Sequence, residues 1–105
     1  MKEKTVLELK EMSERKEDFQ LIDVREQYES EISNLGGELI PLGTIMDEVA
    51  KIDKSKPVII YCRSGSRSAA AVNQLEKRFG FTNLYNLKGG ILAYAELVDP
   101  GLTKY

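Results

Sequence analysis

The sequence predicts an α/β fold in which a mostly parallel sheet carries helices on both faces. Two observations support this prediction. Short apolar runs alternate with amphipathic segments along the chain, and the connections between them are short. The clearest run, Val58–Tyr61, is apolar at every position, as expected for a central parallel strand that is buried on both faces. No linker, repeat or low-complexity tract interrupts the pattern, so residues 1–105 are predicted to form one domain.

Strands and helices are expected in strict alternation after an opening helix. The strands are predicted at residues 19–24, 38–40, 58–61 and 83–87. The helices are predicted at residues 6–17, 26–32, 45–52, 67–79 and 91–97. Thr5 and Thr44 are expected to cap the first and third helices, and Gly80 stands where a helix commonly ends. The residues expected to face inward are Val6, Leu7, Leu9 and Met12 in the first helix, Ile45, Met46, Val49 and Ile52 in the third, and Ala70, Ala71, Leu75 and Phe79 in the fourth. The tail at residues 98–105 is expected to be irregular.

Composition excludes several kinds of chemistry. The chain has no histidine and one cysteine, Cys62. Histidine-dependent catalysis, internal disulfides and multi-cysteine metal sites are therefore excluded, and neither a metal nor an organic cofactor is expected. The net charge of −2 predicts no nucleic-acid or anionic membrane partner. The longest aliphatic run is far shorter than the ~20 residues of a membrane span. No signal core follows the charged N-terminus, so a cytoplasmic location is expected.

The chemistry is expected in the loop after the central strand, because ligands of parallel sheets bind beyond the carboxyl ends of the strands. The small residues of this loop allow a tight turn with its backbone N–H groups pointing inward, and the next helix presents its N-terminus. Two arginines add permanent positive charge, so the cysteine is expected to be a thiolate near neutral pH. The predicted site consists of Cys62, Arg63, Ser64, Gly65, Ser66, Arg67 and Ser68.

Several other residues fit structural roles. A single cysteine at a strand end is, on its own, commonly a small buried hydrophobe, and only its combination with the loop favours chemistry. Asp23 and Arg25 are expected to cap the next helix and to pair with neighbours, with a role at the rim of the site as the alternative. Gly89 and Gly90 are expected to meet a backbone requirement, with the same alternative. Glu26, Glu29 and Glu31 are expected on a solvated face, and Tyr28, Tyr61 and Tyr85 in packing.

Three segments of the chain resemble the rhodanese family of sulfurtransferases. The loop from Cys62 to Arg67 is close to the form usual in the family. Residues 21–26 are similar to the family's first conserved block, and residues 86–91 are similar to its C-terminal block. The resemblance runs from about Thr5 to the last predicted helix. It implies a rhodanese-like three-layer sandwich with a mostly parallel central sheet.

The resemblance also implies a cycle on one sulfur atom. The Cys62 thiolate would take a sulfane sulfur from a donor such as thiosulfate or a persulfide, and would pass it from the resulting persulfide to a thiophilic acceptor. The loop N–H groups, together with Arg63 and Arg67, would stabilise the anionic persulfide and orient an anionic donor. A protein sulfur donor or acceptor is a possible partner, and the sequence does not name the physiological donor, the acceptor or the oligomeric state.

Two alternatives remain open on the sequence. Thiolate phosphatases and arsenate reductases share this fold, but the phosphatase pattern has one residue more between cysteine and arginine than the four between Cys62 and Arg67. The shorter loop predicts a smaller cradle, suited to one bound sulfur. The other alternative is a sulfur carrier or binding module that acts only with a protein partner.

The chain departs from the family pattern at two places. Residues 33–38 replace a stretch in which the family often has histidine and proline, which puts the shape of this loop in doubt. Tyr94 stands where the family often has tryptophan. The tail is similar to the end of rhodanese domains fused to activators of ubiquitin-like sulfur carriers, which mildly favours a sulfur-relay partner.

Overall fold

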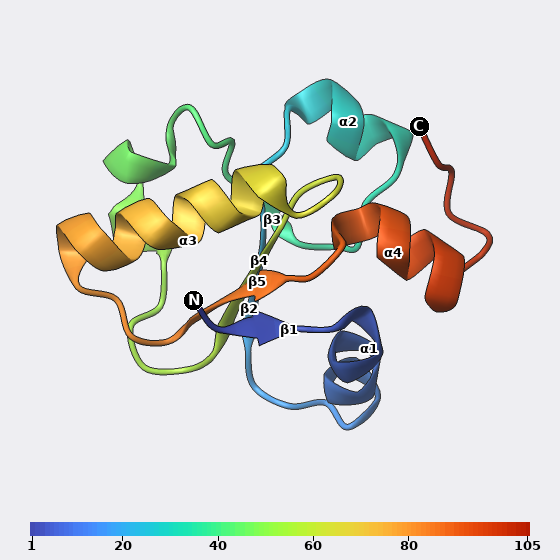
Figure 1. Ribbon diagram of the computed structural model, residues 1–105, viewed down its shortest axis with the longest axis horizontal. Helices are drawn as coiled ribbons and strands as arrows, with labels where there is room; N and C mark the ends of the chain where they lie inside the picture. The colour runs from blue at the N-terminus through green and yellow to red at the C-terminus, as the bar shows by residue number, and fades with distance from the viewer.

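The protein contains one five-stranded sheet in which all neighbouring strands are parallel (Figure 1). The computed structural model describes residues 1–105. Its strands are β1 (Glu3–Lys4), β2 (Gln20–Asp23), β3 (Glu38–Leu39), β4 (Val58–Tyr61) and β5 (Leu84–Leu87). Their order in the sheet is β1-β5-β4-β2-β3, so β4 is central. The predicted α/β fold with a parallel sheet is confirmed.

Helices cover both faces of this sheet. The helix α1 (Val6–Glu14) packs with α4 (Gly90–Leu97), and α3 (Ser66–Phe79) packs on the opposite face (Figure 1). The short helix α2 (Gln27–Ile32) follows β2 and lies beside the C-terminus of the chain. No helix is both long and apolar enough to cross a membrane.

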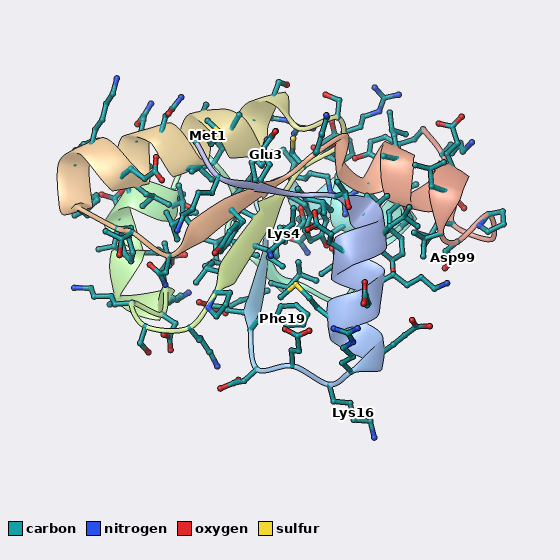
Figure 2. All side chains as sticks on the ribbon, turned by 60° about the horizontal axis from the view of Figure 1, so that its bottom comes forward. Met1, Glu3, Lys4, Lys16, Phe19 and Asp99 are labelled. Carbon is teal, nitrogen blue, oxygen red and sulfur yellow. The ribbon has the colours of Figure 1, made fainter.

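The sheet separates two hydrophobic cores. Ile60 packs with Val72 and Leu75 of α3, whereas Ile59 packs with Leu9 of α1 and with Leu87. Successive residues of a strand point to opposite faces, so β4 contributes to both cores. Burial of each such side chain contributes about 1.5–3 kcal/mol, which explains why β4 is apolar throughout. Figure 2 shows Phe19 lying between β2 and α1, where it packs against the second core.

The predicted helix ends are largely confirmed. The backbone N–H of Glu8 donates to the Thr5 hydroxyl at 3.1 Å, and the N–H of Thr5 donates to the Glu8 carboxylate at 2.8 Å. This reciprocal pair satisfies two N–H groups that the first turn of α1 would leave without partners. Helix α3 ends at Gly80, whose φ of 72° lies in the left-handed region that glycine adopts at helix ends.

The structure corrects the helix predicted at residues 45–52. This segment forms two short 3₁₀ helices, η1 (Ile45–Asp47) and η2 (Val49–Lys51). The Thr44 hydroxyl donates back to the carbonyl of Pro41 at 3.2 Å and caps no helix. Ile45 and Ile52 are buried at the two ends of the segment, and these anchors hold a compact turn rather than a continuous helix.

Three predicted inward positions and one missed strand are further corrections. Leu7 and Phe79 are exposed by 56% and 43%, and Ala70 is also exposed, because each lies on the solvent side of its helix. The strand β1 was not predicted, since its two residues are charged. It forms through pairing with β5, where the N–H of Lys88 donates to the carbonyl of Lys4 at 2.9 Å.

Candidate functional site

The loop that carries Cys62 begins directly after β4 and leads into α3. Gly65 precedes the first residue of α3 and has a φ of 107°, a left-handed conformation that glycine adopts at little cost. This turn directs the N-terminus of α3 at the cysteine, whose side chain is fully buried. The sequence prediction placed the loop and the helix start within one residue of their observed positions.

Two backbone N–H donors and one hydroxyl group converge on the sulfur of Cys62, and the single proton of that hydroxyl is shared with Asn86. The backbone N–H of Gly65 lies 3.1 Å from Sγ, and the N–H and hydroxyl of Ser68 each lie 3.4 Å from it. Burial raises the pKa of the Cys62 thiol, but these donors and the N–H of Ser64 outweigh it, so the pKa is lowered overall. The N–H and O–H groups of the loop therefore lower the pKa of the thiol, whereas the sequence prediction also assigned this effect to the two arginines.

The turn between β5 and α4 packs directly against this loop. The N–H of Ile91 donates to the carbonyl of Cys62 at 3.0 Å, and the N–H of Leu92 donates to that of Arg63 at 3.1 Å. A Cβ at Gly90 would lie only 2.5 Å from the Arg63 carbonyl oxygen, and the φ of Gly90 is 60°. The predicted backbone requirement is confirmed for Gly90, and its cause is close approach to the cysteine loop.

Arg67 points from the first turn of α3 to Glu29 of α2. Its two terminal nitrogens lie 2.7 and 2.8 Å from the two carboxylate oxygens, a bidentate pair. This ion pair lowers the pKa of Glu29 to about 2 and raises the pKa of Arg67. The side chain of Glu29 is 4% exposed, so its predicted place on a solvated face is wrong.

Arg63 points toward the C-terminal tail. Its guanidinium donates to the backbone carbonyl of Tyr105 and lies 5.1 Å from the centre of the Tyr105 ring. The Tyr105 hydroxyl donates to Glu29 at 2.7 Å and accepts from Arg25 at 2.9 Å. The tail therefore joins three charged residues at this end of the sheet, which also explains why the C-terminus lies beside α2 (Figure 1).

Asp23 and Arg25 form a fully buried ion pair at the end of β2. The Arg25 guanidinium donates to the two Asp23 oxygens at 2.9 and 2.8 Å. It also donates to the carbonyls of Glu29 and Ser33 and to the Tyr105 hydroxyl, which satisfies its remaining N–H groups. The predicted pairing is confirmed. The predicted cap is not, because the N–H of Glu26 at the start of α2 is bound by Glu29.

Asn86 of β5 lies behind the cysteine loop. Its Nδ2 donates to the carbonyl of Gly65 at 3.2 Å, and its Oδ1 accepts from the Ser68 hydroxyl at 2.5 Å. Both Gly65 and Ser68 donate to the sulfur, so Asn86 holds in place the two residues that contact it. Asn86 is 4% exposed, and these bonds offset the cost of burying its amide.

The structure brings together some of the predicted site residues and separates others. Gly65 and Ser68 contact the sulfur, Ser64 and Ser66 are exposed, and the two arginines bind oxygen partners rather than Sγ. Sequence reasoning missed Glu29, Asn86 and Tyr105. The sequence contained a signal for the burial of Glu29. Gln27 and Glu31 are four residues apart and pair on the exposed side of α2, so Glu29, which lies between them in sequence, faces another side of the helix.

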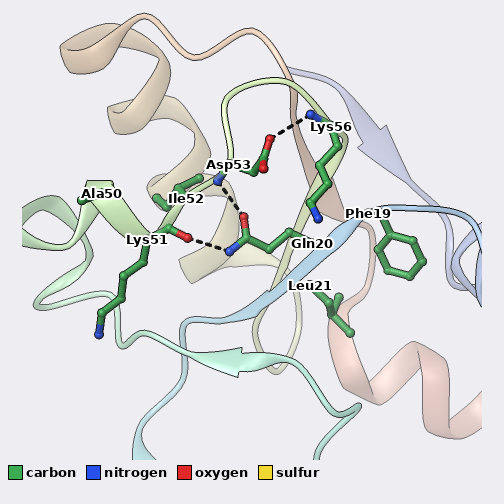
Figure 3. Close-up of a pocket in the computed structure, with 8 residues that line it drawn as sticks. All are labelled: Phe19, Gln20, Leu21, Ala50, Lys51, Ile52, Asp53 and Lys56. Atoms are coloured by element: carbon green, nitrogen blue, oxygen red, sulfur yellow. Dashed lines mark hydrogen bonds between the residues drawn. The ribbon is translucent and has the colours of Figure 1, made fainter.

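None of the surface cavities opens onto the sulfur of Cys62. Two cavities are of nearly equal volume. One, of about 410 Å³, lies at the amino end of the sheet between β2 and η2, where Figure 3 shows Gln20 bridging its wall. The other, of about 400 Å³, lies at the carboxyl end beside Thr5, Lys88 and Gly89. None of the four cavities is lined by Cys62. No group of three or more His, Cys, Asp or Glu side chains is placed to hold a metal ion.

The fold and the site define a domain that presents a buried cysteine sulfur to the N-terminus of a helix. The family model of the rhodanese-like domain matches residues 5–97. The chain belongs to the rhodanese-like domain family. A crystal structure of a rhodanese-like domain protein from Staphylococcus aureus has a TM-score of 0.83 at 32% identity, covering 100% of this chain and 99% of that one.

Two curated relatives are similar over the same domain. "Rhodanese-like/PpiC domain-containing protein 12, chloroplastic" from Arabidopsis thaliana is 39% identical over 85% of this chain and 31% of that protein. "Probable adenylyltransferase/sulfurtransferase MoeZ" from Mycobacterium tuberculosis (strain CDC 1551 / Oshkosh) is 36% identical over 81% of this chain and 22% of that protein. The chain therefore spans less than a third of the length of either relative. Relatives of this domain include proteins named as sulfurtransferases.

Proposed function

We propose that this chain is a sulfurtransferase domain that carries one sulfane sulfur on Cys62 as a persulfide. One observation carries the proposal: the donors of Gly65 and Ser68 converge on a buried sulfur whose pKa they lower. Such a cradle stabilises negative charge on sulfur, both in the thiolate and in the persulfide that replaces it. The printed name of MoeZ, which includes a sulfurtransferase, supports the same activity for this domain.

The first half of the proposed cycle loads the cysteine. The Cys62 thiolate attacks the outer sulfur of a donor such as thiosulfate or a persulfide. The bond from Sγ to that sulfur forms, the sulfur–sulfur bond of the donor breaks, and its electron pair leaves with sulfite or a thiolate. The new outer sulfur carries the negative charge toward the N-terminus of α3. Backbone N–H groups from Ser64 to Ser68 are proposed to bind it, and Arg63 and Arg67 to attract the donor.

The second half of the cycle unloads the cysteine. A thiophilic nucleophile such as cyanide attacks the outer sulfur, takes it, and leaves the electron pair of the broken bond on Sγ as thiolate. Charge stays on sulfur in both halves, so no side chain has to shuttle a proton. The absence of histidine from the chain is consistent with this chemistry. The cycle needs a reduced thiol, which the proposed cytoplasmic location would maintain.

Intact mass spectrometry tests this proposal. The reduced chain is incubated with thiosulfate or with cysteine persulfide and then treated with cyanide. We expect a gain of one sulfur atom, confined to Cys62, that cyanide removes as thiocyanate. Cys62→Ser is the matched control, since it keeps the size of the side chain and should not be loaded. Sulfur that loads equally onto the Cys62→Ser chain would refute the proposal.

A second candidate function is a carrier that accepts sulfur only from a protein partner. One observation favours it: Cys62 is fully buried and no cavity opens onto it, while Tyr105 and Glu29 hold both loop arginines. A partner that displaced the tail would free Arg63 from its bond to Tyr105. Loading by a persulfidated protein, with none by thiosulfate or cysteine persulfide, would select this candidate over a stand-alone enzyme.

A further inference from the structure

Each arginine near the sulfur already has an oxygen partner. Arg67 makes its bidentate pair with Glu29, Arg25 is paired with Asp23, and Arg63 donates to the carbonyl of Tyr105. None of the three guanidinium groups is directed at Sγ by a hydrogen bond. A donor that is held by charge must therefore compete with partners supplied by the chain itself.

The side-chain charges of the three arginines, Asp23, Glu29 and Cys62 balance when Cys62 is ionised. The positive charges of Arg25, Arg63 and Arg67 equal the negative charges of two carboxylates and one thiolate. Cys62, Asp23 and Glu29 are buried, so solvent screens an added charge poorly. Thiosulfate would bring two further negative charges to this cluster, whereas a persulfide brings one. The same cluster therefore opposes thiosulfate more strongly than it opposes a persulfide.

Among the carboxylates of this cluster, Glu29 is the one whose charge reaches the cysteine loop directly, because its partner Arg67 belongs to that loop. Protonation does not relieve this charge at neutral pH, since the ion pair with Arg67 holds the pKa of Glu29 at about 2. Arg67 also interacts electrostatically with Cys62, so the carboxylate acts on the sulfur through Arg67. Neutralising Glu29 would leave the positive charge of Arg67 free to act on an incoming anion.

On the basis of the proposed function, we infer that Glu29 is a specificity-determining residue that selects against doubly charged donors, so that the sulfur donor is a persulfide rather than thiosulfate. In the balanced step, the Cys62 thiolate attacks the outer sulfur of R–S–S⁻. The bond between the two donor sulfurs breaks, and its electron pair leaves on the thiolate R–S⁻. One negative charge enters the cluster and one leaves it, so the charge balance of the site is unchanged by the transfer.

The test compares two donors on three proteins. The rates at which thiosulfate and cysteine persulfide load Cys62 are measured by intact mass for the wild type, Glu29→Gln and Glu31→Gln. Gln at position 29 keeps a side-chain oxygen that accepts from Arg67 and from Tyr105. Glu31 is the matched control, because it lies on the same helix and is exposed. The wild type is expected to prefer cysteine persulfide, which can be measured without any variant.

The decisive quantity is the ratio of the thiosulfate rate to the persulfide rate. Removing one charge favours a dianion over a monoanion, so Glu29→Gln should raise this ratio about tenfold, whereas Glu31→Gln should leave it unchanged. A purely structural role for Glu29 would lower both rates together, and an unchanged ratio would overturn the inference. A wild type that prefers thiosulfate would overturn it as well. If neither donor loads Cys62, the proposed stand-alone sulfurtransferase fails, and loading by a persulfidated protein then tests the carrier candidate; this outcome is distinct from an unchanged ratio.

Discussion

The two ends of the sheet both hold hydrogen-bonded polar side chains, but those at the carboxyl end are buried around a cysteine sulfur, whereas those at the amino end are only partly buried. At the amino end, the Gln20 amide donates to the Lys51 carbonyl at 2.7 Å and accepts from the N–H of Asp53 at 2.8 Å, beside a cavity of about 410 Å³ (Figure 3). At the carboxyl end, Gly65 and Ser68 donate to one sulfur atom that no cavity reaches. The cavity beside Gln20 and the buried sulfur of Cys62 therefore lie at opposite ends of the sheet.

The difference follows from the direction of the strands. All strands run parallel, so the loop after β4 and the N-terminus of α3 meet at the carboxyl end, where N–H groups are left without helical partners. At the amino end, the polar side chains bind backbone groups of the connecting loops instead. Asn83 donates to the carbonyls of Asp53 and Lys56, both at 2.8 Å. We therefore expect substitutions at the amino end to change stability alone, and those at the carboxyl end to change the sulfur too.

The largest effect on stability is expected for Arg25→Met. This substitution leaves the Asp23 carboxylate buried without its partner, so the free energy of unfolding should fall by about 3–5 kcal/mol. Urea denaturation followed by circular dichroism measures the change. Arg78→Met, at the exposed end of α3, is the control and should cost little. A loss below about 1 kcal/mol for Arg25→Met would show that the pair adds nothing beyond packing.

Gly90→Ala is expected to have the next largest effect. The added Cβ would press on the backbone of Arg63 and Cys62, and the left-handed φ of 60° strains any residue other than glycine. We expect a loss of about 2–3 kcal/mol, together with a changed rate of Cys62 alkylation by iodoacetamide. Gly43→Ala is the control, because its Cβ would meet no atom within 4 Å. If Gly90→Ala destabilised the protein but left the alkylation rate unchanged, the prediction that this turn influences the sulfur would be wrong.

The ion pair of Glu29 predicts a dependence of stability on pH. Its folded pKa of about 2 lies below the ordinary value of 4.5, so its stabilisation is complete above pH 4.5 and is lost as the pH falls toward 2. We expect about 2 kcal/mol, discounted because solvent partly screens Arg67. Urea denaturation between pH 6 and pH 2 should show a steeper loss for the wild type than for Glu29→Gln. Parallel curves for the two proteins would contradict the assigned ion pair.

The sequence was informative where local pattern decides the structure. The apolar composition of β4, the glycine after α3 and the cysteine loop all follow from residues that are adjacent in the chain. These features sufficed to predict the parallel sheet and the position of Cys62. The capping pair of Thr5 and Glu8 is local in the same way, since its members are three residues apart.

The sequence was uninformative where distant residues decide the structure. Glu29 is buried only because the fold brings Arg67, 38 positions away, within bonding distance. Arg63 was expected to face the anion, but Tyr105, 42 positions away, accepts its hydrogen bonds. The strand β1 has two charged residues and exists through its pairing with β5. Periodicity within a short segment contains no information about such partners.

The smallest effect is expected for Gln20→Leu at the amino end. The substitution removes the two hydrogen bonds that join β2 to the segment before β4. Water from the open cavity can reach the groups left without partners, so the loss of unfolding free energy should be only about 1 kcal/mol. Gln27→Leu is the control, since its amide contacts only the exposed Glu31. Urea denaturation measures both variants.

The same variant gives the sharpest test of the contrast between the two ends. Gln20 lies at the start of β2, and the sulfur follows the end of the neighbouring strand β4, so no polar contact joins them. The pH profile of Cys62 alkylation should therefore be the same in Gln20→Leu as in the wild type. A shifted profile would mean that strain at the amino end passes along β4 to the sulfur. The donors at Gly65 and Ser68 would then depend on the whole sheet, and the two ends could not be treated as separate.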